Sequence, residues 1–530
     1  MDKQSRLSIR SVATVLLSYG VLVGGGFYVG KHVLIPALTG RSSNPSGVLG
    51  SAGDRRDRSQ LTLLGDTFSG YRLFQSESFQ AALKESGTPL VYRDQVNQAS
   101  RAEALDTGKA DLILTTLDQF LRHRPKGQIV GLINRTVGAD AAVLNRKKYP
   151  QLNSLFDLKL LVEKAKAKGE KLSVVYAGDT PSEYLAQVLD TKFETFNLSD
   201  FDVIKVADDD AAWAALKDES KNVAIAIVRE PFVAQAQDQG YPVALSSQDT
   251  PKSIVDVLVA SDQLLKSEPD QVSTLVETYY RRLDAQAESQ ENRPDNGERA
   301  PSDSAALDGI KFFSAPESKK WMEDGTLKQR INAISSVLVL SGQLDTIPAD
   351  PEELYTAQPL VTAAENTQQL INLVQKDDPQ LADKLKGLVA RRPSPPKLSR
   401  TQIQVAPNIG NMYLQEQVQF PKGSIQLNTN DVTILDQLAS ELDEFNPETV
   451  AIRVIGHTAK AGPVEANKTL SRRRADVVVK YLQSKGVQQT MITEGRGCID
   501  PMPDVPPEDA RQQRTEIRLV RINAQKVSSL

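Results

Sequence analysis

The residue types that carry most enzymatic and metal chemistry are scarce in this chain of 530 residues. Its single cysteine, Cys498, excludes an intrachain disulfide and any cysteine-rich zinc site. The three histidines, His32, His123 and His457, lie too far apart in the sequence to form a paired metal-ligand motif. The sequence also lacks a Gly-x-Ser-x-Gly elbow and a His-Glu-x-x-His motif. We therefore expect no catalytic residue, no metal, no cofactor and no enzyme activity.

Polar and basic residues gather near the carboxyl terminus. They lie in Gly456–Thr458, at Asn467, in Leu470–Ala475 and in Gln513–Ile517. A guanidinium takes a carboxylate in two parallel hydrogen bonds, so the arginines of such a group suit recognition of an anion. The order of these motifs resembles the OmpA-like domain, the module that grips peptidoglycan in bacterial envelopes, and the resemblance covers 416–522.

The resemblance implies that Thr458, Asn467, Arg474 and Arg514 surround a peptidoglycan ligand. In that family an aspartate directly after Gly-His-Thr receives the ammonium of diaminopimelate, while the arginine at the helix start takes its carboxylate. Arg474 occupies the arginine position, but Ala459 occupies the aspartate position. Loss of one charge-assisted hydrogen bond costs about 1.5–3 kcal/mol. We therefore expect peptidoglycan binding to be weakened by Ala459, or replaced by binding of a different anion.

Several short motifs follow one another earlier in the chain. Each is weak alone, but their shared order is similar to that of type 2 periplasmic binding proteins of the nitrate, sulfonate and phosphate-uptake kind. The resemblance spans about 61–360 and implies two α/β lobes on a hinge that close around a small solute. The motifs are Leu61–Tyr71, Leu105–Asp111, Val130–Leu132, Gly138–Ala141, Glu230–Phe232 and Val255–Ala260.

The same resemblance places a ligand at the carboxyl ends of the strands, where helix amino termini present free amide hydrogens to an anion. We therefore expect a small, anionic solute. Arg229 stands where the family has a tryptophan, and either adds positive charge to the cleft or sits at its rim. The candidate ligand-binding residues are Ser69, Gly70, Tyr71, Thr115, Thr116, Thr180, Ser182 and Glu230.

Several of these residues also have a purely structural interpretation, which the sequence leaves open. Thr180 and Ser182 are suited to capping the helix that they begin. Arg472–Arg474 can form a solvated helix face. Gly456 and His457 can shape the turn that follows their strand.

The hydrophobic pattern predicts the elements that hold these residues. From Leu61 onwards, short branched apolar runs alternate with helix-like segments, which is typical of an α/β domain with a largely parallel sheet. After Tyr413 the pattern changes to that of an α+β sandwich. We predict an α/β two-lobed domain like that of periplasmic binding proteins, an α+β OmpA-like sandwich and one amino-terminal transmembrane helix.

Composition marks the boundaries between these units. Residues 286–304 contain no aromatic or branched aliphatic side chain, so we expect a mobile insertion there. The prolines of Arg391–Pro396 stop the preceding helix. The expected division is 1–38 membrane anchor, 39–60 flexible linker, 61–365 two-lobed domain, 366–412 helical and Pro-rich linker, 413–523 OmpA-like domain and 524–530 tail.

Ser11–Gly30 carries no charged residue, and at about 1.5 Å per residue it is long enough for the roughly 30 Å hydrocarbon layer. We expect a single-pass anchor in the inner (cytoplasmic) membrane, with both soluble domains in the periplasm. A cleaved secretory signal is the alternative, because the basic segment Lys3–Arg10 precedes the apolar run. The small residues Gly20 and Gly24 lie on one helix face, where they suit a homodimer contact.

The net charge is −4, from 63 basic and 67 acidic residues. This excludes a nucleic-acid scaffold, because phosphate binding needs a basic surplus. The leading interpretation is a membrane-anchored extracytoplasmic protein that binds a small solute and approaches the cell wall. The alternative is a structural or stator-like envelope scaffold without solute capture. A stator needs an acidic proton carrier in its membrane helix, and Ser11–Gly30 has none.

Overall fold

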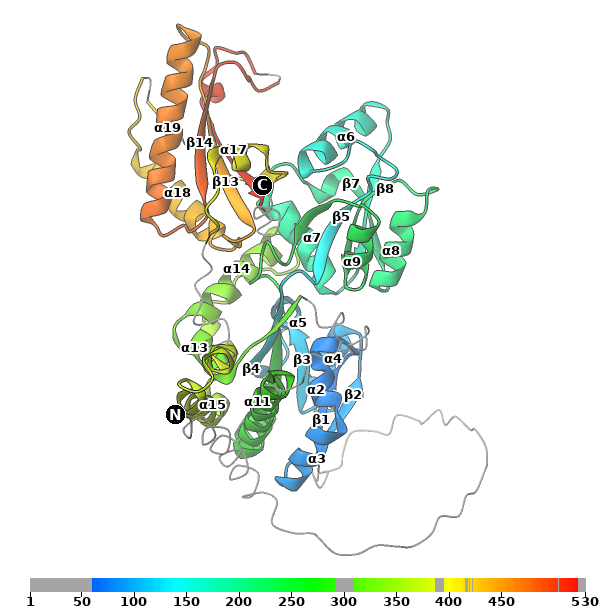
Figure 1. Ribbon diagram of the computed structural model, residues 1–530. Coiled ribbons are helices and arrows are strands. Elements are labelled where there is room, and N and C mark those ends of the chain that lie inside the picture. The colour runs from blue at the N-terminus through cyan, green and yellow to red at the C-terminus, as the bar shows by residue number, and fades with distance from the viewer. Residues whose placement is uncertain are drawn as a thin grey trace, which may run out of the picture.

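The computed structural model of the protein describes residues 60–291, 309–386, 395–414, 418, 420–421, 423–503 and 505–522. These residues form two α/β lobes and a carboxy-terminal domain that lies beside the second lobe (Figure 1). The predicted membrane helix, the linker up to residue 59 and the tail from residue 524 lie outside the described residues. Among the helices that the structure describes, none is long and apolar enough to cross a bilayer.

The first lobe is built on a six-stranded sheet. β1 pairs in parallel with β2 and β3, whereas β10 runs antiparallel to β3 and β4. β3 reads Leu-Ile-Leu-Thr-Thr and is buried along its whole length, as expected for a strand covered on both faces. In spatial order the strands are β11 (Ile310–Phe312), β4 (Gly127–Thr136), β10 (Val255–Ser261), β3 (Leu112–Thr116), β1 (Leu61–Gly65) and β2 (Leu90–Asp94).

Amphipathic helices cover this sheet. Their apolar faces meet in pairs such as Phe74 and Tyr279, whose rings stack with centroids 4.5 Å apart. The helices are α2 (Arg72–Gln75), α3 (Glu77–Glu85), α4 (Gln98–Asp106), α5 (Leu117–His123), α10 (Asp262–Ser267), α11 (Pro269–Glu291), α13 (Ala315–Glu323), α14 (Thr326–Leu340), α15 (Val361–Val374) and α16 (Pro379–Leu385).

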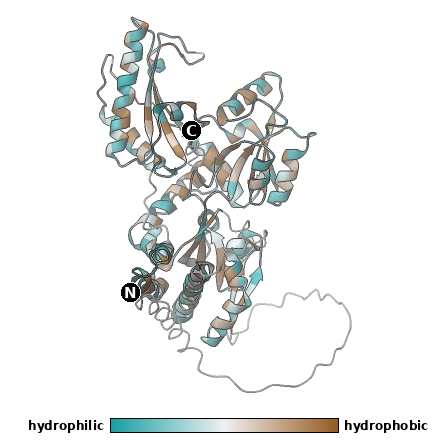
Figure 2. Ribbon diagram, in the orientation of Figure 1, coloured by the Kyte–Doolittle hydropathy of each residue, from teal (hydrophilic) through white to brown (hydrophobic). Residues whose placement is uncertain are grey.

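The second lobe has a five-stranded sheet in which β6 pairs in parallel with β7 and β8, and β5 runs antiparallel to β8 and β9. Hydrophobic residues concentrate on the strands, whereas the helices carry hydrophilic residues (Figure 2). The strands, in spatial order, are β7 (Phe201–Val206), β6 (Leu172–Ala177), β8 (Val223–Arg229), β5 (Asp140–Leu144) and β9 (Val243–Ser246), and the helices are α6 (Leu155–Ala167), α7 (Pro181–Lys192), α8 (Asp209–Lys217) and α9 (Phe232–Asp238).

The chain crosses between the two lobes twice within this region. It leaves the first lobe after β4 and begins β5 at Asp140, and it returns between β9 and β10. Two crossings of this kind form a hinge, because only a few backbone residues need to rotate for the lobes to open or close. The predicted two-lobed architecture is therefore confirmed.

The carboxy-terminal domain is the predicted α+β sandwich. Its helix α19 packs directly on β13, because Gly456 leaves no side chain between them: a Cβ there would lie 2.2 Å from the carbonyl oxygen of Ser471. Its strands, in spatial order, are β12 (Asn408–Asn411), β15 (Thr515–Arg521), β13 (Val450–His457) and β14 (Met491–Gly497), and its helices are α17 (Arg400–Val405), α18 (Thr429–Leu442) and α19 (Val464–Ser484).

This domain is attached to the second lobe by polar contacts. Asn411 Nδ2 donates to Glu194 Oε1 over 2.7 Å, and Asn446 Nδ2 donates to the carbonyl oxygen of Gln248 over 3.1 Å. Arg521 forms an ion pair with Asp249, which lies in the second crossing between the lobes. These contacts fix the carboxy-terminal domain against residues close to the hinge.

Two of the predicted segment assignments need correction. The predicted mobile insertion begins inside helix α11, which continues to Glu291, and residues 292–308 lie outside the described residues. The segment 366–412 contains helices as predicted, but its first part packs on the first lobe: Thr367 Oγ1 on α15 donates to Asp284 Oδ2 on α11 over 2.6 Å. At its other end, β12 pairs with β15 and so belongs to the carboxy-terminal sheet.

Candidate functional site

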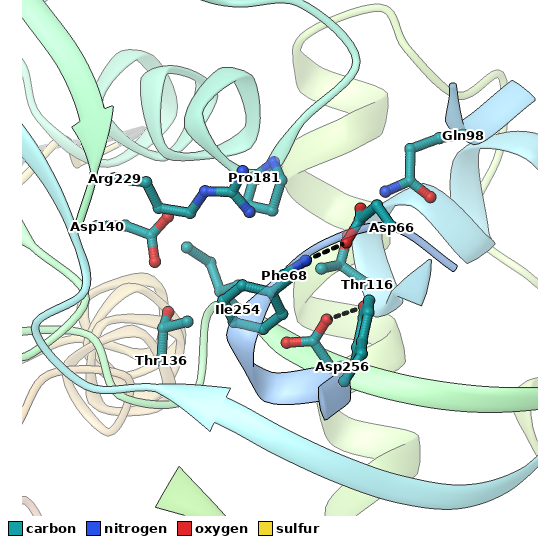
Figure 3. Close-up of a pocket in the computed structure, with 11 residues that line it drawn as sticks. Asp66, Phe68, Gln98, Thr116, Thr136, Asp140, Pro181, Arg229, Ile254 and Asp256 are labelled. Atoms are coloured by element: carbon teal, nitrogen blue, oxygen red, sulfur yellow. Dashed lines mark hydrogen bonds between the residues drawn. The ribbon is translucent and has the colours of Figure 1, made fainter. Parts of the chain in front are cut away.

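The two lobes meet at a small polar cavity beside the crossings. Its volume is about 20 Å³, which is the space of a single water-sized group. The side chains come from both lobes and from the ends of strands β1, β3, β4 and β8 (Figure 3). The lining residues are Asp66, Phe68, Tyr71, Gln98, Thr116, Thr136, Asp140, Pro181, Arg229, Ile254 and Asp256.

The turn after β1 brings three of these side chains into the cavity. A Cβ on Gly65 would lie 2.1 Å from Tyr92 Oη, so glycine is required where β1 ends. Tyr92 Oη donates to the carbonyl oxygen of Asp66 over 2.6 Å, and the backbone N–H of Phe68 donates to Asp66 Oδ1 over 3.0 Å. A short 3₁₀ turn at Ser69–Tyr71 then buries the ring of Tyr71.

The structure brings two of the eight predicted ligand-binding residues, Tyr71 and Thr116, to the wall of the cavity. Ser69 and Gly70 lie in the 3₁₀ turn beside it. Gly70 has a packing role, because a Cβ there would lie 2.5 Å from Asn134 Nδ2. Thr115 is not among the lining residues, but its hydroxyl donates to Oε1 of Gln98, which lines the cavity, over 2.9 Å.

The remaining three predicted residues make local contacts. Thr180 caps α7 by accepting the backbone N–H of Ser182, which is the structural role that the sequence left open. Ser182 Oγ donates to Asp209 Oδ1 over 3.1 Å. Glu230 accepts the backbone N–H of Ala234 over 3.1 Å at the start of α9. Pro181, between the first two, lines the cavity instead.

The sequence prediction missed the carboxylates of Asp66, Asp140 and Asp256. A signal for each was present. Asp66 follows the first strand, Asp140 begins a strand directly after a glycine-containing turn, and Asp256 interrupts the apolar run of β10. Charged residues in the buried part of a strand are rare unless they are paired or functional.

Each arginine at the cavity is already paired with a carboxylate. Arg229 Nη2 lies 3.3 Å from Asp209 Oδ2, and its guanidinium lies 5.5 Å from the centroid of the Phe68 ring. Arg101 is fully buried, and its Nη2 lies 2.7 Å from Asp66 Oδ2. The predicted anionic solute therefore finds no unpaired cation among the described residues that line the cavity.

Asp140 and Asp256 have no arginine or lysine of their own. Tyr71 Oη donates to Asp256 Oδ1, but neither carboxylate oxygen of Asp140 has a hydrogen-bond partner among the described residues. Burial raises the pKa of Asp140 to about 6, although the charge of Arg229 opposes the shift. Burial likewise raises the pKa of Asp256 to about 8, and the nearby charge of Asp66 raises it further. Among the described residues that line the cavity, carboxyl groups thus outnumber basic groups, and burial favours the protonated form of two of them.

At the predicted peptidoglycan site the buried charged group is an arginine, and its guanidinium is already hydrogen-bonded within the chain. Arg474 is 2 % exposed, and its guanidinium donates to the carbonyl oxygens of Pro421 and Ser424 and to Gln513 Oε1, each over 3.0 Å. Ala459 is buried and offers no acceptor.

The other predicted residues of that site also have partners or are buried. Asn467 Nδ2 donates to the carbonyl oxygen of Ala461 over 3.0 Å, and the buried Thr458 donates its backbone N–H to Gly497. Arg514 Nη2 lies 3.0 Å from Glu516 Oε1.

Glu516 joins these residues to the histidine of the motif. His457 is 2 % exposed, and its Nε2 lies 3.1 Å from Glu516 Oε1. Burial alone would raise the pKa of Glu516, but the contact with His457 and the charges of Arg514 and Arg518 lower it to about 2. Arg514 and Arg518 share this one carboxylate, so the network links neighbouring side chains within the domain.

Comparison with known proteins agrees with this division. Residues 419–515 match the OmpA family. Over 89 residues the chain is 36 % identical to the Outer membrane protein A of Shimwellia blattae, a match that covers 15 % of this chain and 37 % of that protein. The chain thus spans well under half of the curated relatives that it matches.

Solved structures resemble the amino-terminal part. The periplasmic aliphatic sulphonate binding protein SsuA from Escherichia coli has a TM-score of 0.40 and 15 % identity, and the match covers 57 % of this chain and 93 % of that one. The periplasmic nitrate-binding protein NrtA from Synechocystis PCC 6803 has a TM-score of 0.40 and 14 % identity, with 60 % and 90 % covered. The chain therefore combines the two α/β lobes described above with a carboxy-terminal segment that matches the OmpA family.

Proposed function

We propose that this protein captures a small solute between its two lobes while its carboxy-terminal domain approaches the cell wall. The observation that carries the proposal is the cavity itself: buried polar groups without partners face each other where the chain crosses twice between the lobes. Buried polar groups are normally hydrogen-bonded, so such a cluster suits a ligand that completes it. The proposal includes no catalytic step.

The proposal also includes the location of the protein. Ser11–Gly30 anchors the chain in the inner membrane, and both soluble domains lie in the periplasm. A homodimer through Gly20 and Gly24 fits this arrangement. Protease added to spheroplasts tests the orientation: the soluble domains should be digested while a cytoplasmic marker protein stays intact. Protection of both would refute this location.

Cell-wall contact is the weaker half of the function. The match to the OmpA family supports it, whereas Ala459 and the internal partners of Arg474 limit its strength. We therefore propose that the carboxy-terminal domain binds peptidoglycan weakly.

A scaffold without solute capture is the second candidate function. The small volume of the cavity, about 20 Å³, favours it, since most ligand pockets are an order of magnitude larger. A thermal-shift screen of the full-length chain in detergent separates the two. A solute at 100 times its Kd adds about 2.7 kcal/mol to the free energy of unfolding. An increase in the unfolding temperature with any small solute supports solute capture. An unchanged unfolding temperature with amines, anions and neutral solutes supports the scaffold.

A further inference from the structure

We infer that the cavity between the lobes binds the cationic nitrogen of an amine, with Asp140 as its counter-ion and Asp256 as the second carboxylate. This inference rests on the proposed solute capture and names the chemical class of the solute. It departs from the anion that the sequence led us to expect.

The first argument is the balance of charge. Arg229 is paired with Asp209 and Arg101 with Asp66, so each positive charge close to the cavity already has a carboxylate partner. Among the described residues, Asp140 and Asp256 then form no ion pair of their own, although the charge of Arg229 acts on both. An anion would have to displace Asp209 from Arg229 and lie beside these carboxylates. A cation meets neither obstacle, because it replaces an unbalanced charge with an ion pair.

The second argument is the set of atoms without hydrogen-bond partners. Both carboxylate oxygens of Asp140 are fully buried and unpartnered among the described residues. The hydroxyls of Thr116 and Thr136, which also line the cavity, are buried and unpartnered too. An ammonium group has three donors and no acceptor, so it can satisfy carboxylate and hydroxyl oxygens together. A threonine hydroxyl can donate as well as accept, so the preference for an ammonium over an oxyanion depends on the two carboxylate oxygens of Asp140, which only accept when the group is ionised.

The third argument is the shape of the cavity. In Figure 3, Asp140 and Arg229 lie on one side of Phe68, and Asp66 and Asp256 lie on the other. The volume of about 20 Å³ takes one ammonium head, and anything larger requires the lobes to part. Asp140 belongs to the second lobe and Asp256 to the first, so like charges face the cleft from both lobes. A bound cation removes their repulsion, which couples binding to closure.

The ionisation of the two carboxylates agrees with this assignment. Asp140 is surrounded by Arg229, Asp209 and Asp118, and Asp256 by Tyr71, Asp66 and Arg229. Burial raises the pKa of both, so part of the population is neutral near pH 7 without ligand. A bound cation favours the ionised forms, so amine affinity should increase from pH 5 to pH 8, where an alkylammonium remains protonated.

Isothermal titration of the full-length chain in detergent tests the inference, at constant ionic strength and pH 7.5. The probes are methylammonium and 1,4-diaminobutane, compared with methanesulfonate and nitrate. We expect the amines to bind and the anions to give no heat. Asp140→Asn should weaken amine binding about tenfold to a hundredfold, because it removes a charge-assisted hydrogen bond.

The controls separate the site from the fold. Asp202→Asn alters an exposed carboxylate on β7 outside the cavity, and amine binding should be unchanged. Asp140→Asn should unfold at the same temperature as the unmodified chain or higher, since it removes a buried charge without a partner. Asp256→Asn provides a second variant if Asp140→Asn does not fold.

Three outcomes overturn the inference. Binding of the anions without the amines would do so and leave the proposed solute capture intact. Unchanged amine affinity in both Asp140→Asn and Asp256→Asn would show that the amine binds elsewhere. Absence of binding by either class of probe would remove the inference and the proposed capture together.

Discussion

The cavity between the lobes and the predicted peptidoglycan site of the carboxy-terminal domain are opposite in charge. In the cavity, Asp140 and Asp256 are buried and form no ion pair among the described residues, and the arginines nearby are paired with other carboxylates. In the carboxy-terminal domain, Arg474 has its hydrogen bonds to the chain itself, and the carboxylate of the clamp is replaced by Ala459. The backbone of a predicted binding site can therefore be present although the charged groups expected to bind the ligand are absent or of the opposite sign.

The largest effect should come from breaking an ion pair at the cavity. Arg101→Met leaves Asp66 close to a buried site without its guanidinium, which costs about 3–5 kcal/mol of unfolding free energy. Denaturant unfolding measures the loss. Lys171→Ala, which removes an exposed pair with Asp202, should change stability by less than about 1 kcal/mol. Equal effects of the two substitutions would contradict the assignment of a buried pair.

The unpaired carboxylate should make the ligand-free protein less stable at high pH. The pKa of Asp140 is about 6 in the folded chain, above its ordinary value of 3.8, so the folded state holds the proton more tightly. Stability therefore falls as pH rises from about 4 through about 6, by about 3 kcal/mol at most for two units. Thermal unfolding between pH 4.5 and pH 8.5 should show a shallower fall in Asp140→Asn. A part of the fall should remain, because the pKa of Asp256 is also raised.

A carboxylate at position 459 should strengthen peptidoglycan binding. Ala459→Asp adds an acceptor for an ammonium, worth about tenfold to a hundredfold in affinity. Sedimentation of the full-length chain with isolated peptidoglycan measures it. Ala461→Asp adds the same charge at a nearby exposed position and is the matched control. If both variants sediment like the unmodified chain, the clamp is not the limiting contact.

The smallest effect should separate capping from ligand contact in the second lobe. Thr180→Ala removes the acceptor for the backbone N–H of Ser182 and should cost about 1 kcal/mol. Its affinity for methylammonium should equal that of the unmodified chain, as measured by the same titration. A large loss of affinity with unchanged stability would make Thr180 a ligand residue after all.

The sequence was sufficient for the order and type of most elements, because branched apolar runs and helical spacing depend on local patterns. It was insufficient for β12, which has one branched residue, Ile409, and becomes a strand only by pairing with β15. The helical linker predicted for 366–412 includes α16, but its packing through Leu381 and Leu385 beside α11 and α15 was not predicted. These elements depend on partners far away in the chain.

Two of the eight predicted residues, Tyr71 and Thr116, line the cavity, but its carboxylates were not predicted. Asp140 and Asp256 are adjacent to the crossings, and their lack of an ion pair among the described residues depends on where Arg101 and Arg229 find their partners. Such pairings connect residues that are distant in sequence, so no local motif reveals them.

The attachment of the carboxy-terminal domain has a mechanical consequence. Arg521 holds Asp249 in the stretch that carries the chain back to the first lobe, and Arg330 on α14 pairs with Glu444. A force applied to the carboxy-terminal domain would therefore reach the backbone that joins the two lobes. If that domain binds the wall and the chain is anchored in the membrane, as proposed, tension between the two and solute binding in the cleft would act on the same backbone segment.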